Sequence, residues 1–220
     1  MSKKSLNDYR ILGKHYENVL KKFGDNNRGM DWNNDIDSAL RFKVIEELII
    51  TKINLKDTKI KLLDFGCGTS NFFQYLKNKN KHRHYIYTGI DINNSSIEIA
   101  KQKFPSNTYF HRDILRENTC LDVYDFIIIN GLFTQKLSLS VKKMTEFMFN
   151  ILSKLSNNFS VGLAFNVLSE NVDYINKKNF YPKSSQLEDF ICKNITRSFI
   201  IRHDYGLYEK TFYLYKDLYR

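Results

Sequence analysis

Three aspartates stand at the ends of three short apolar runs, and the first of them opens a glycine turn. Asp64 follows "IKLL" and precedes Gly66 and Gly68, which have a single residue between them. Asp91 ends the run "YTGID", and Asp113 ends "YFHRD". A strand that turns through glycines into a helix offers backbone N–H groups to a ligand, and nearby carboxylates add charge and hydrogen-bond acceptors. These residues predict a small-molecule site at the ends of neighbouring strands.

The glycine turn also indicates the charge of that ligand. A dinucleotide site would show GxGxxG and hold a pyrophosphate at the helix N-terminus, but Asn71 stands where the third glycine would be. Asp64 would repel a pyrophosphate and attract a cation such as S-adenosylmethionine, which carries a sulfonium and an ammonium group. Asp91 lies about 25 residues after Gly66, near the offset of about 20 residues expected for a carboxylate that binds ribose hydroxyls. Asp113 can accept a hydrogen bond from an adenine amine.

Two helices are expected before this site. Apolar residues at helical spacing predict a helix over residues 5–22, with Gly24 as its stop. A second helix is expected over residues 35–50, with Asp35 or Asp37 near its N-cap.

Strands and helices alternate in the rest of the chain, which predicts a mostly parallel sheet with helices on both faces. The last two strands are joined by only three residues and should form an antiparallel hairpin. An insertion is expected over residues 168–184. The expected strands are 60–65, 84–91, 108–113, 124–131, 160–167, 197–205 and 209–216, and the helices between them are 70–78, 94–104, 141–155 and 184–195.

The composition fits one folded domain. The chain has 220 residues, of which 42% are hydrophobic and 15% aromatic, so it can bury a core. No apolar run is long enough to span a bilayer, and the N-terminal sequence lacks the pattern of a signal peptide, so a cytoplasmic location is expected. Cys67, Cys120 and Cys192 show no CxxC spacing and are expected to be reduced thiols. No His/Asp cluster has metal-ligand spacing, so no metal is expected.

The positive charge leaves two interpretations open. Lys and Arg number 34 against 24 Asp and Glu, which gives a formal net charge of +10. A nucleic-acid partner would explain this excess. A general lysine bias with dispersed charge explains it equally, because the densest basic run, residues 77–84, falls in an expected helix-to-strand loop.

Four motifs in order resemble those of class I S-adenosylmethionine-dependent methyltransferases. They are "LLDFGCGTSNF", "YTGIDINNSSIEIAKQKF", "FHRDIL" and "YDFIIINGLF", and the resemblance covers roughly residues 60–216. It implies a Rossmann-like α/β fold with a seven-stranded sheet, mostly parallel with an antiparallel last strand. It also implies S-adenosylmethionine as cofactor and S-adenosylhomocysteine as product. The helices before residue 55 would then form an N-terminal lid (1–55) on a methyltransferase domain (56–220).

The resemblance assigns each motif a part of the cofactor. The glycine turn would hold the methionine part, the second motif the ribose and adenine, the third the adenine, and the fourth would line the methyl-transfer site. The residues that carry these roles are Asp64, Gly66, Cys67, Gly68, Asp91, Ile92, Asp113, Ile114 and Asn130. Ser70 departs from the pattern, because it stands where many relatives have glycine.

Other interpretations of these motifs are weaker. "DFG" also occurs in protein kinases, but "HRD" follows it here in the wrong chain order, and no glycine-rich loop or strand lysine accompanies it. Asp64 and Asp91 could serve only as helix caps. Cys67 is expected to be a small packed residue, because the nucleophile of a cytosine-methylating enzyme would lie in the loop after the strand 124–131.

The substrate is less clearly indicated. Adenine- and amide-nitrogen-methylating enzymes usually have a double-proline turn after the fourth strand, and this chain has Asn130-Gly131-Leu132-Phe133 instead. Further stretches, including "NGLFTQK" and "RHDYGLYEKTFYLYK", resemble short bacterial methyltransferases of surface-polysaccharide pathways. That resemblance implies O-methylation of a small surface-glycan precursor: a sugar, a sugar nucleotide or a capsule phosphoramidate group.

Candidate substrate-side residues lie in the last hairpin and near the N-terminus. His203 is the first candidate base, with Asp204 to orient it, and His15 is the second. An anionic substrate would need cations rather than a base. The candidates for substrate contact are Trp32, Arg41, Lys136, Arg202, Tyr205 and Tyr208. Each has a structural alternative: the histidine and tyrosines can pack the hairpin, Trp32 can anchor the core, and Arg41 can be solvated.

Three functions therefore remain open. The first is an O-methyltransferase of a small molecule, either neutral or anionic. The second is an RNA methyltransferase, which the charge favours and the fourth motif opposes. The third is a protein that binds S-adenosylmethionine without transferring a methyl group. The sequence does not give the acceptor atom or the oligomeric state.

Overall fold

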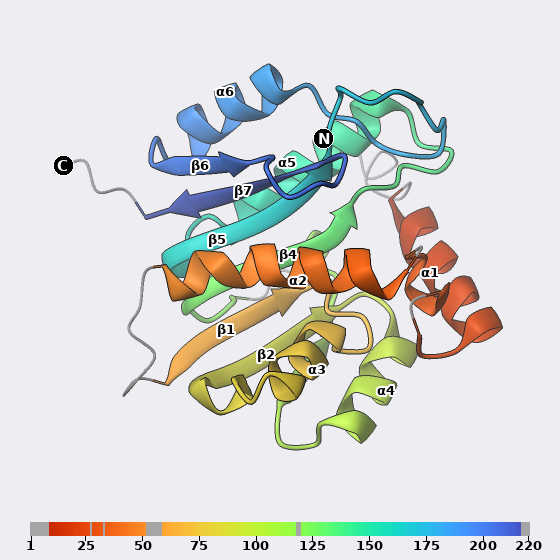
Figure 1. The fold of residues 1–220 in the computed structure, drawn as a ribbon, viewed down its shortest axis with the longest axis vertical. Helices are drawn as coiled ribbons and strands as arrows, with labels where there is room; N and C mark the ends of the chain where they lie inside the picture. The colour runs from red at the N-terminus through yellow and green to blue at the C-terminus, as the bar shows by residue number, and fades with distance from the viewer. Residues whose placement is uncertain (1–8, 27, 33, 52–58, 118–119, 217–220) are drawn as a thin grey trace.

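A seven-stranded sheet forms the centre of the protein (Figure 1), as seen in a computed structural model that describes residues 9–26, 28–32, 34–51, 59–117 and 120–216. The strand order is β3-β2-β1-β4-β5-β7-β6. Strands β1 to β5 run parallel, and β7 runs antiparallel to both β5 and β6. This confirms the expected Rossmann-like sheet with its antiparallel last strand. The strands are β1 Ile60–Phe65, β2 Tyr85–Asp91, β3 Thr108–His111, β4 Tyr124–Phe133, β5 Phe159–Leu168, β6 Phe199–Arg202 and β7 Glu209–Tyr215.

Helices cover both faces of the sheet. The buried residues of α2, α3 and α4 pack on one face, and those of α5 and α6 pack on the other together with the start of α1. In Figure 1, α1 lies beyond the carboxyl ends of β1 and β4. The helices are α1 Arg10–Phe23, α2 Asp35–Ile50, α3 Asn71–Asn78, α4 Asn94–Lys103, α5 Val141–Leu155 and α6 Ser184–Asn194, with 3-10 turns η1 Arg28–Met30 and η2 His82–His84.

The central strands are apolar on both sides because both sides are covered. In β4, Phe126 and Ile128 belong to the core under α2, whereas Ile127 and Ile129 belong to the core under α5. Successive side chains of a strand point to opposite faces. A continuous apolar run is therefore what a strand in the middle of a two-sided sheet requires.

The N-terminal helices differ slightly from the prediction. Gly24 ends α1 with a left-handed φ of 76°, as expected. The cap of α2 is Asn34, whose side chain accepts a hydrogen bond from the Asp37 N–H at 2.8 Å. Asp35 and Asp37 therefore lie in the first helical turn, where negative charge suits the helix dipole. Residues 5–8 of the first expected helix and the expected domain boundary at 55/56 lie outside the described residues.

The segment after β5 packs against the segment after β4. Gln135 forms an isolated bridge with Asn179, and the Lys136 N–H donates to the Lys178 carbonyl at 2.8 Å. The expected insertion over residues 168–184 thus packs beside the segment that follows β4. Within the part of the chain that the structure describes, no helix is long and apolar enough to cross a membrane.

Candidate functional site

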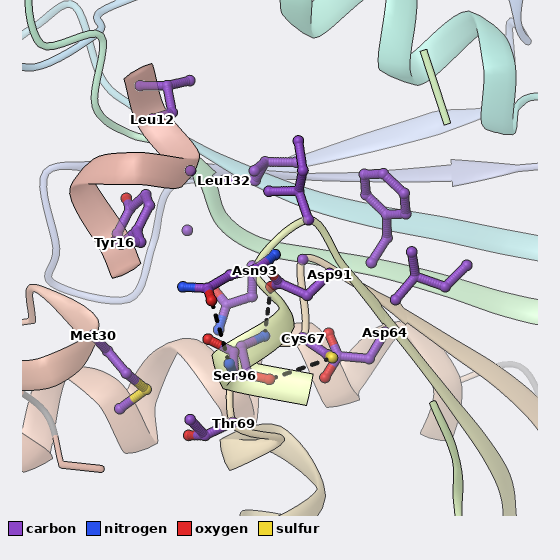
Figure 2. A pocket seen from close by; sticks show the side chains of 18 of the residues that line it. Leu12, Tyr16, Met30, Asp64, Cys67, Thr69, Asp91, Asn93, Ser96 and Leu132 are labelled. Atoms are coloured by element: carbon purple, nitrogen blue, oxygen red, sulfur yellow. Dashed lines mark hydrogen bonds between the residues drawn. The ribbon is translucent and has the colours of Figure 1, made fainter. Parts of the chain in front are cut away.

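A cavity of about 160 Å³ lies at the carboxyl ends of β1, β2 and β4. The glycine turn after β1 forms one wall, and α1 and η1 cover it from the opposite side. Figure 2 shows Asp64, Cys67 and Asp91 grouped at the turn, with Tyr16 and Met30 of the covering segments across from them. The strand order reverses between β1 and β4, and this crevice is where open α/β sheets bind ligands.

Positive φ angles and backbone hydrogen bonds fix the conformation of the glycine turn. Gly66 and Gly68 have φ values of 78° and 52°, which an L side chain adopts only with strain. The N–H groups of Gly66 and Cys67 donate to the Ile90 carbonyl at 2.8 and 3.1 Å, which ties the turn to β2. A Cβ added to Gly68 would meet nothing within 4 Å. Gly68 therefore presents bare backbone to open space.

Two carboxylates, the half-buried Asp91 and the buried Asp64, face the cavity beside this turn. Asp91 accepts hydrogen bonds from the N–H groups of Gly68 and Asn93, each at 2.8 Å. Asp64 is 3% exposed and accepts a hydrogen bond from the Tyr87 hydroxyl at 2.5 Å. Burial raises the pKa of Asp64 to about 7, against the hydrogen bond from Tyr87, and the charge of Asp91 adds to the rise. Burial also raises the pKa of Asp91, although its N–H donors oppose the change. Negative charge here would be stabilised by a cationic ligand.

Two amide side chains in the cavity wall have buried polar atoms that no described residue satisfies. Both side-chain polar atoms of Asn130, and Nδ2 of Asn93, are buried and have no hydrogen bond to any described residue. Leaving a buried polar group unsatisfied costs about 1–3 kcal/mol. Unpartnered donors and acceptors in a cavity wall are what a polar ligand would satisfy.

Hydrogen bonds fasten the covering segments over the cavity. The Tyr9 hydroxyl donates to the carboxylate of Asp113, at 2.8 Å to Oδ1 and 2.7 Å to Oδ2. After α1, Asp25 forms an ion pair with Lys103 of α4 at 2.8 Å and accepts a hydrogen bond from the Thr69 hydroxyl at 2.5 Å. The cover is thus joined to α4, to the glycine turn and to the end of β3.

Helix α1 packs closely against Ile92, the residue that follows β2. A Cβ on Gly13 would lie 3.1 Å from Cγ2 of Ile92, so only glycine fits without displacement. Leu12 is buried beside Gly13, and Ile114 is buried in the same core cluster. Ile92 and Ile114, which the sequence assigned to the adenine, both line the cavity.

A buried polar network supports the loop at the end of β4. The Gly131 N–H donates to Oδ1 of Asn166 at 2.7 Å, and Nδ2 of Asn166 donates to Oε2 of Glu209 at 2.8 Å. Nε of Arg41 donates to the other oxygen of Glu209 at 2.7 Å. The Trp32 ring packs against Gly131 and lies 5.5 Å from the Arg41 guanidinium. Trp32 lines the cavity, whereas Arg41 is already paired.

The first candidate base lies apart from the cavity. Nδ1 of His203 is 2.7 Å from the Glu209 carbonyl oxygen. Asp204 pairs with Arg202 at 2.6 Å rather than with His203, and Arg202 also binds Glu47 at 2.6 Å. None of these side chains lines the cavity.

The remaining substrate candidates, two in the last hairpin and one after β4, are also engaged elsewhere. Tyr205 forms a hydrogen bond with Thr211 at 2.9 Å, and Tyr208 donates to Asp173 at 2.5 Å. Lys136 donates to the carbonyl three residues further along the chain at 3.3 Å.

The second candidate base, His15, lies nearer to the cavity. Its Nε2 is 2.8 Å from Oδ2 of Asp31, which also accepts a hydrogen bond from Gln135 at 2.5 Å. Asp31 has a left-handed φ of 60°. Tyr16, the neighbour of His15, lines the cavity, and burial together with the charge of Asp31 raises the pKa of Tyr16 to about 12. Figure 2 shows Tyr16 on the α1 side of the cavity.

Several residues of the site were not foreseen from the sequence. Asn166 could have been noticed as a polar residue in the mostly apolar strand β5, and Tyr87 as a tyrosine in the largely buried strand β2. Glu209 begins β7 and is followed by Lys210 and Thr211, so its residue type gives no such signal. Asn93 and Asp31 lie in loops whose sequence alone gives no such signal. No group of three or more His, Cys, Asp or Glu that could hold a metal ion occurs among the described residues.

Comparison with known proteins finds similarity to methyltransferases. Residues 63–169 match the model of a family described as a methyltransferase domain. The protein of Mycobacterium tuberculosis named "Putative methyltransferase Rv1506c" is 25% identical over 150 residues, which are 67% of this chain and 88% of that protein.

Solved structures agree on the fold. Magnesium protoporphyrin IX methyltransferase from Synechocystis PCC 6803 with bound S-adenosylhomocysteine has a TM-score of 0.67 at 12% identity, covering 96% of this chain and all 100% of that one. A methyltransferase of plantazolicin with bound S-adenosylhomocysteine has a TM-score of 0.60 at 13% identity, covering 97% of this chain and 100% of that one. At these identities the likeness concerns the fold. The family match, by contrast, spans the glycine turn, the end of β2 and the end of β4.

Proposed function

From this methyltransferase domain and its cavity, we propose that the chain transfers a methyl group from S-adenosylmethionine to a small acceptor. The observation that carries the proposal is the joining of Asp91 to the bare backbone of Gly68 at the cavity wall. The half-buried carboxylate of Asp91 is thereby held beside the turn that the sequence predicts to bind the cofactor. The cytoplasmic location expected from the sequence belongs to the same proposal. So does the division into an N-terminal lid (1–55) and a methyltransferase domain (56–220).

The residues of the cavity fit this cofactor. Asp64 and the glycine turn offer negative charge and open backbone to a cationic amino-acid end, and Asp91 offers carboxylate oxygens to ribose hydroxyls. The unsatisfied amides of Asn93 and Asn130 offer further hydrogen bonds. When bound, S-adenosylmethionine would supply an electrophilic methyl group on a sulfonium. Asn130, at the end of β4, would line the place where the acceptor approaches.

The finer proposal is methylation of an oxygen on a surface-glycan precursor. It is supported by the absence of a double-proline turn after Asn130 and by the resemblance to methyltransferases of surface-polysaccharide pathways. An alcohol acceptor benefits from a base that takes its proton. Of the two histidine candidates, the placement of His15 beside Asp31 and next to the cavity-lining Tyr16 favours His15.

An anionic acceptor would find fewer cations than the sequence suggested. Arg41 is paired with Glu209, and Arg202 is paired with Glu47 and Asp204, so their charges are already balanced. Lys136 is the remaining candidate, because its contact is with a neutral carbonyl.

An RNA methyltransferase and a binding protein without transfer activity are the alternatives. The excess of basic residues favours the first, and only that alternative predicts substrate binding that weakens steeply with salt. The second alternative shares cofactor binding with an enzyme, so only a measurement of methyl transfer distinguishes the two.

The decisive experiment is a methyl-transfer assay with S-adenosylmethionine. Nucleotide sugars, sugar phosphates and nucleotide phosphoramidates would be compared with bulk tRNA and rRNA, following S-adenosylhomocysteine release and the mass gain of one methyl group. We expect turnover on a small acceptor. Turnover on RNA alone would overturn the substrate proposal, and cofactor binding without turnover on either panel would favour the binding protein.

A further inference from the structure

A chain of buried hydroxyl groups runs beneath the glycine turn and ends on Asp64. Nδ2 of Asn107 donates to the Tyr109 hydroxyl at 3.2 Å, and that hydroxyl lies 2.9 Å from Oγ of Ser70. Oγ of Ser70 donates to the Tyr87 hydroxyl at 3.1 Å, which in turn donates to Oδ2 of Asp64 at 2.5 Å. Ser70, Tyr87 and Asp64 are 0%, 2% and 3% exposed.

The backbone of Ser70 is strained in order to place its hydroxyl. Ser70 has a left-handed φ of 67° at the start of α3. A non-glycine residue in that conformation costs roughly 1–2 kcal/mol, and glycine would avoid the cost. The side chain does not cap the helix, because it forms no capping hydrogen bond. Its two hydrogen bonds go instead to Tyr87 and Tyr109, so the strained serine is the link between the two tyrosines.

The hydrogen bonds of this series all run in one direction, from donor to acceptor, toward Asp64. Each hydroxyl has one proton, so a hydroxyl that donates to the next group must accept from the previous one. Because Ser70 donates to Tyr87, it must accept from Tyr109, and Tyr109 accepts from the Asn107 amide. Every proton therefore points toward Asp64. This order suits a carboxylate that is ionised and accepts a hydrogen bond.

Burial of Asp64, with a further contribution from the charge of Asp91, raises the pKa of Asp64 and opposes that ionised state until a cation arrives. Asp91, at the end of β2, adds a second negative charge, and the neighbouring Cys67 thiol is buried with its pKa raised well above the ordinary value. Tyr87 and Tyr109 face the same space, and burial raises the pKa of both hydroxyls, so they remain neutral donors. The other oxygen of Asp64 has no donor among the residues that the structure describes, and Asp64 lines the cavity.

We propose that the chain Asn107–Tyr109–Ser70–Tyr87 positions the ionised form of Asp64 for the cationic end of the cofactor, so that cofactor binding releases a proton from Asp64. Tyr87 and Ser70 are positioning residues, since they act through Asp64. The inference rests on the proposed function, because it takes S-adenosylmethionine as the ligand. It adds that binding depends on pH, and that Ser70, which departs from the usual glycine, belongs to the cofactor site.

Calorimetric titration tests this without measuring turnover. S-adenosylmethionine would be titrated into the full chain at about pH 6.5 in two buffers with different ionisation enthalpies, which gives the number of protons released. With the pKa of Asp64 raised to about 7, about three quarters of a proton should be released per bound cofactor. Asp64→Asn is the reference, because it reports the protons contributed by the ligand itself and by other groups.

Variants along the chain identify the positioning residues. Tyr87→Phe removes the donor to Asp64 and should weaken binding at this pH by about 10-fold, while binding recovers at higher pH. Ser70→Gly breaks the chain and relieves the backbone strain, so it should shift the pH dependence in the same direction without loss of folding. Tyr85→Phe is the matched control, because the Tyr85 hydroxyl on the same strand is buried and has no partner among the described residues.

The outcomes separate the two proposals. Failure of the wild-type chain to bind S-adenosylmethionine would overturn the proposed function and this inference with it. Binding with the same proton count in wild type and Asp64→Asn would overturn the inference alone. So would pH dependences of Tyr87→Phe and Ser70→Gly that match that of Tyr85→Phe.

Discussion

Replacing Arg41 with methionine should destabilise the protein, because Glu209 would keep a buried charge without its partner. The Glu209 side chain is 3% exposed, and that of Arg41 is 17% exposed. One oxygen of Glu209 accepts from Arg41, and the other accepts from Asn166 at 2.8 Å. Methionine retains much of the apolar length of arginine, so the substitution mainly removes charge and hydrogen bonds.

The expected size follows from the burial of the pair. Removal of one partner from a buried ion pair costs about 3–5 kcal/mol, and the partial exposure of Arg41 places the expectation near the lower end, at about 3 kcal/mol. The double variant Arg41→Met/Glu209→Gln removes both charges, and the glutamine amide can still accept from Asn166. It should therefore be more stable than Arg41→Met by about 2 kcal/mol.

Urea unfolding followed by circular dichroism measures these free energies. The fluorescence of Trp32, the single tryptophan of the chain, gives a second probe, because its ring lies 5.5 Å from the Arg41 guanidinium. Lys193→Met is the control: its ion pair with Asp189 is exposed, with side-chain exposures of 69% and 61%, and should change stability by less than about 0.5 kcal/mol. A loss below about 1 kcal/mol for Arg41→Met, or a double variant no more stable than the single one, would refute the reasoning.

Three further predictions concern the cofactor site, acid stability and the cover. Asp91→Asn should lower affinity for S-adenosylmethionine by about 10- to 100-fold, measured by calorimetry, because hydrogen bonds to a charged acceptor are lost; an unchanged affinity would remove Asp91 from the site. Burial tends to raise the pKa of Glu170, but its bonds to Lys210 and to neighbouring groups outweigh burial and lower it to about 2. The stability that this shift supplies is present above pH 4.5, the ordinary pKa of the group, and is lost as the pH falls toward 2. Lys210→Met should therefore weaken the pH dependence of the thermal unfolding midpoint over that range. An unaltered pH dependence would count against this prediction. Gly13→Leu should lower the free energy of unfolding in urea by about 1–3 kcal/mol, because the new side chain collides with Ile92. It should also speed limited proteolysis of α1. Equal protection of the variant and the wild type would show that α1 adjusts to the larger side chain.

The fold, and the grouping of Asp64, Gly68 and Asp91 at one cavity, could be predicted because their signals are local. A few consecutive residues predict the turn from β1 into α3. The alternation of strands and helices then predicts that the two further acids lie at the ends of β2 and β3. Parallel strands bring such residues to one edge of the sheet whatever the details of packing. Asp64, Gly68 and Asp91 therefore come together as the spacing indicated.

The substrate side could not be predicted in the same way, because an edge of a sheet is wider than one cavity. The cavity lies over β2, β1 and β4, whereas β7 is separated from β4 by β5. Neighbouring strands are about 4.8 Å apart, so residues at the start of β7 lie roughly 10 Å to the side of β4. His203 is thus at the expected edge and still apart from the cavity. The pairing of Arg41 with Glu209 joins residues 168 positions apart, and no local pattern encodes it.

The cover and the cofactor need not compete for Asp113. Tyr9 contacts both oxygens of this carboxylate, which at first sight excludes the adenine amine that the sequence assigned to it. A carboxylate, however, has about four acceptor positions, and a single hydroxyl proton uses only one of them at a time. Burial and the neighbouring Asp113 both raise the pKa of Tyr9, so its hydroxyl stays a donor and adds no negative charge. A bound adenine would then share Asp113 with Tyr9, so the contact that holds the start of α1 over the cavity would not have to break when the cavity is filled.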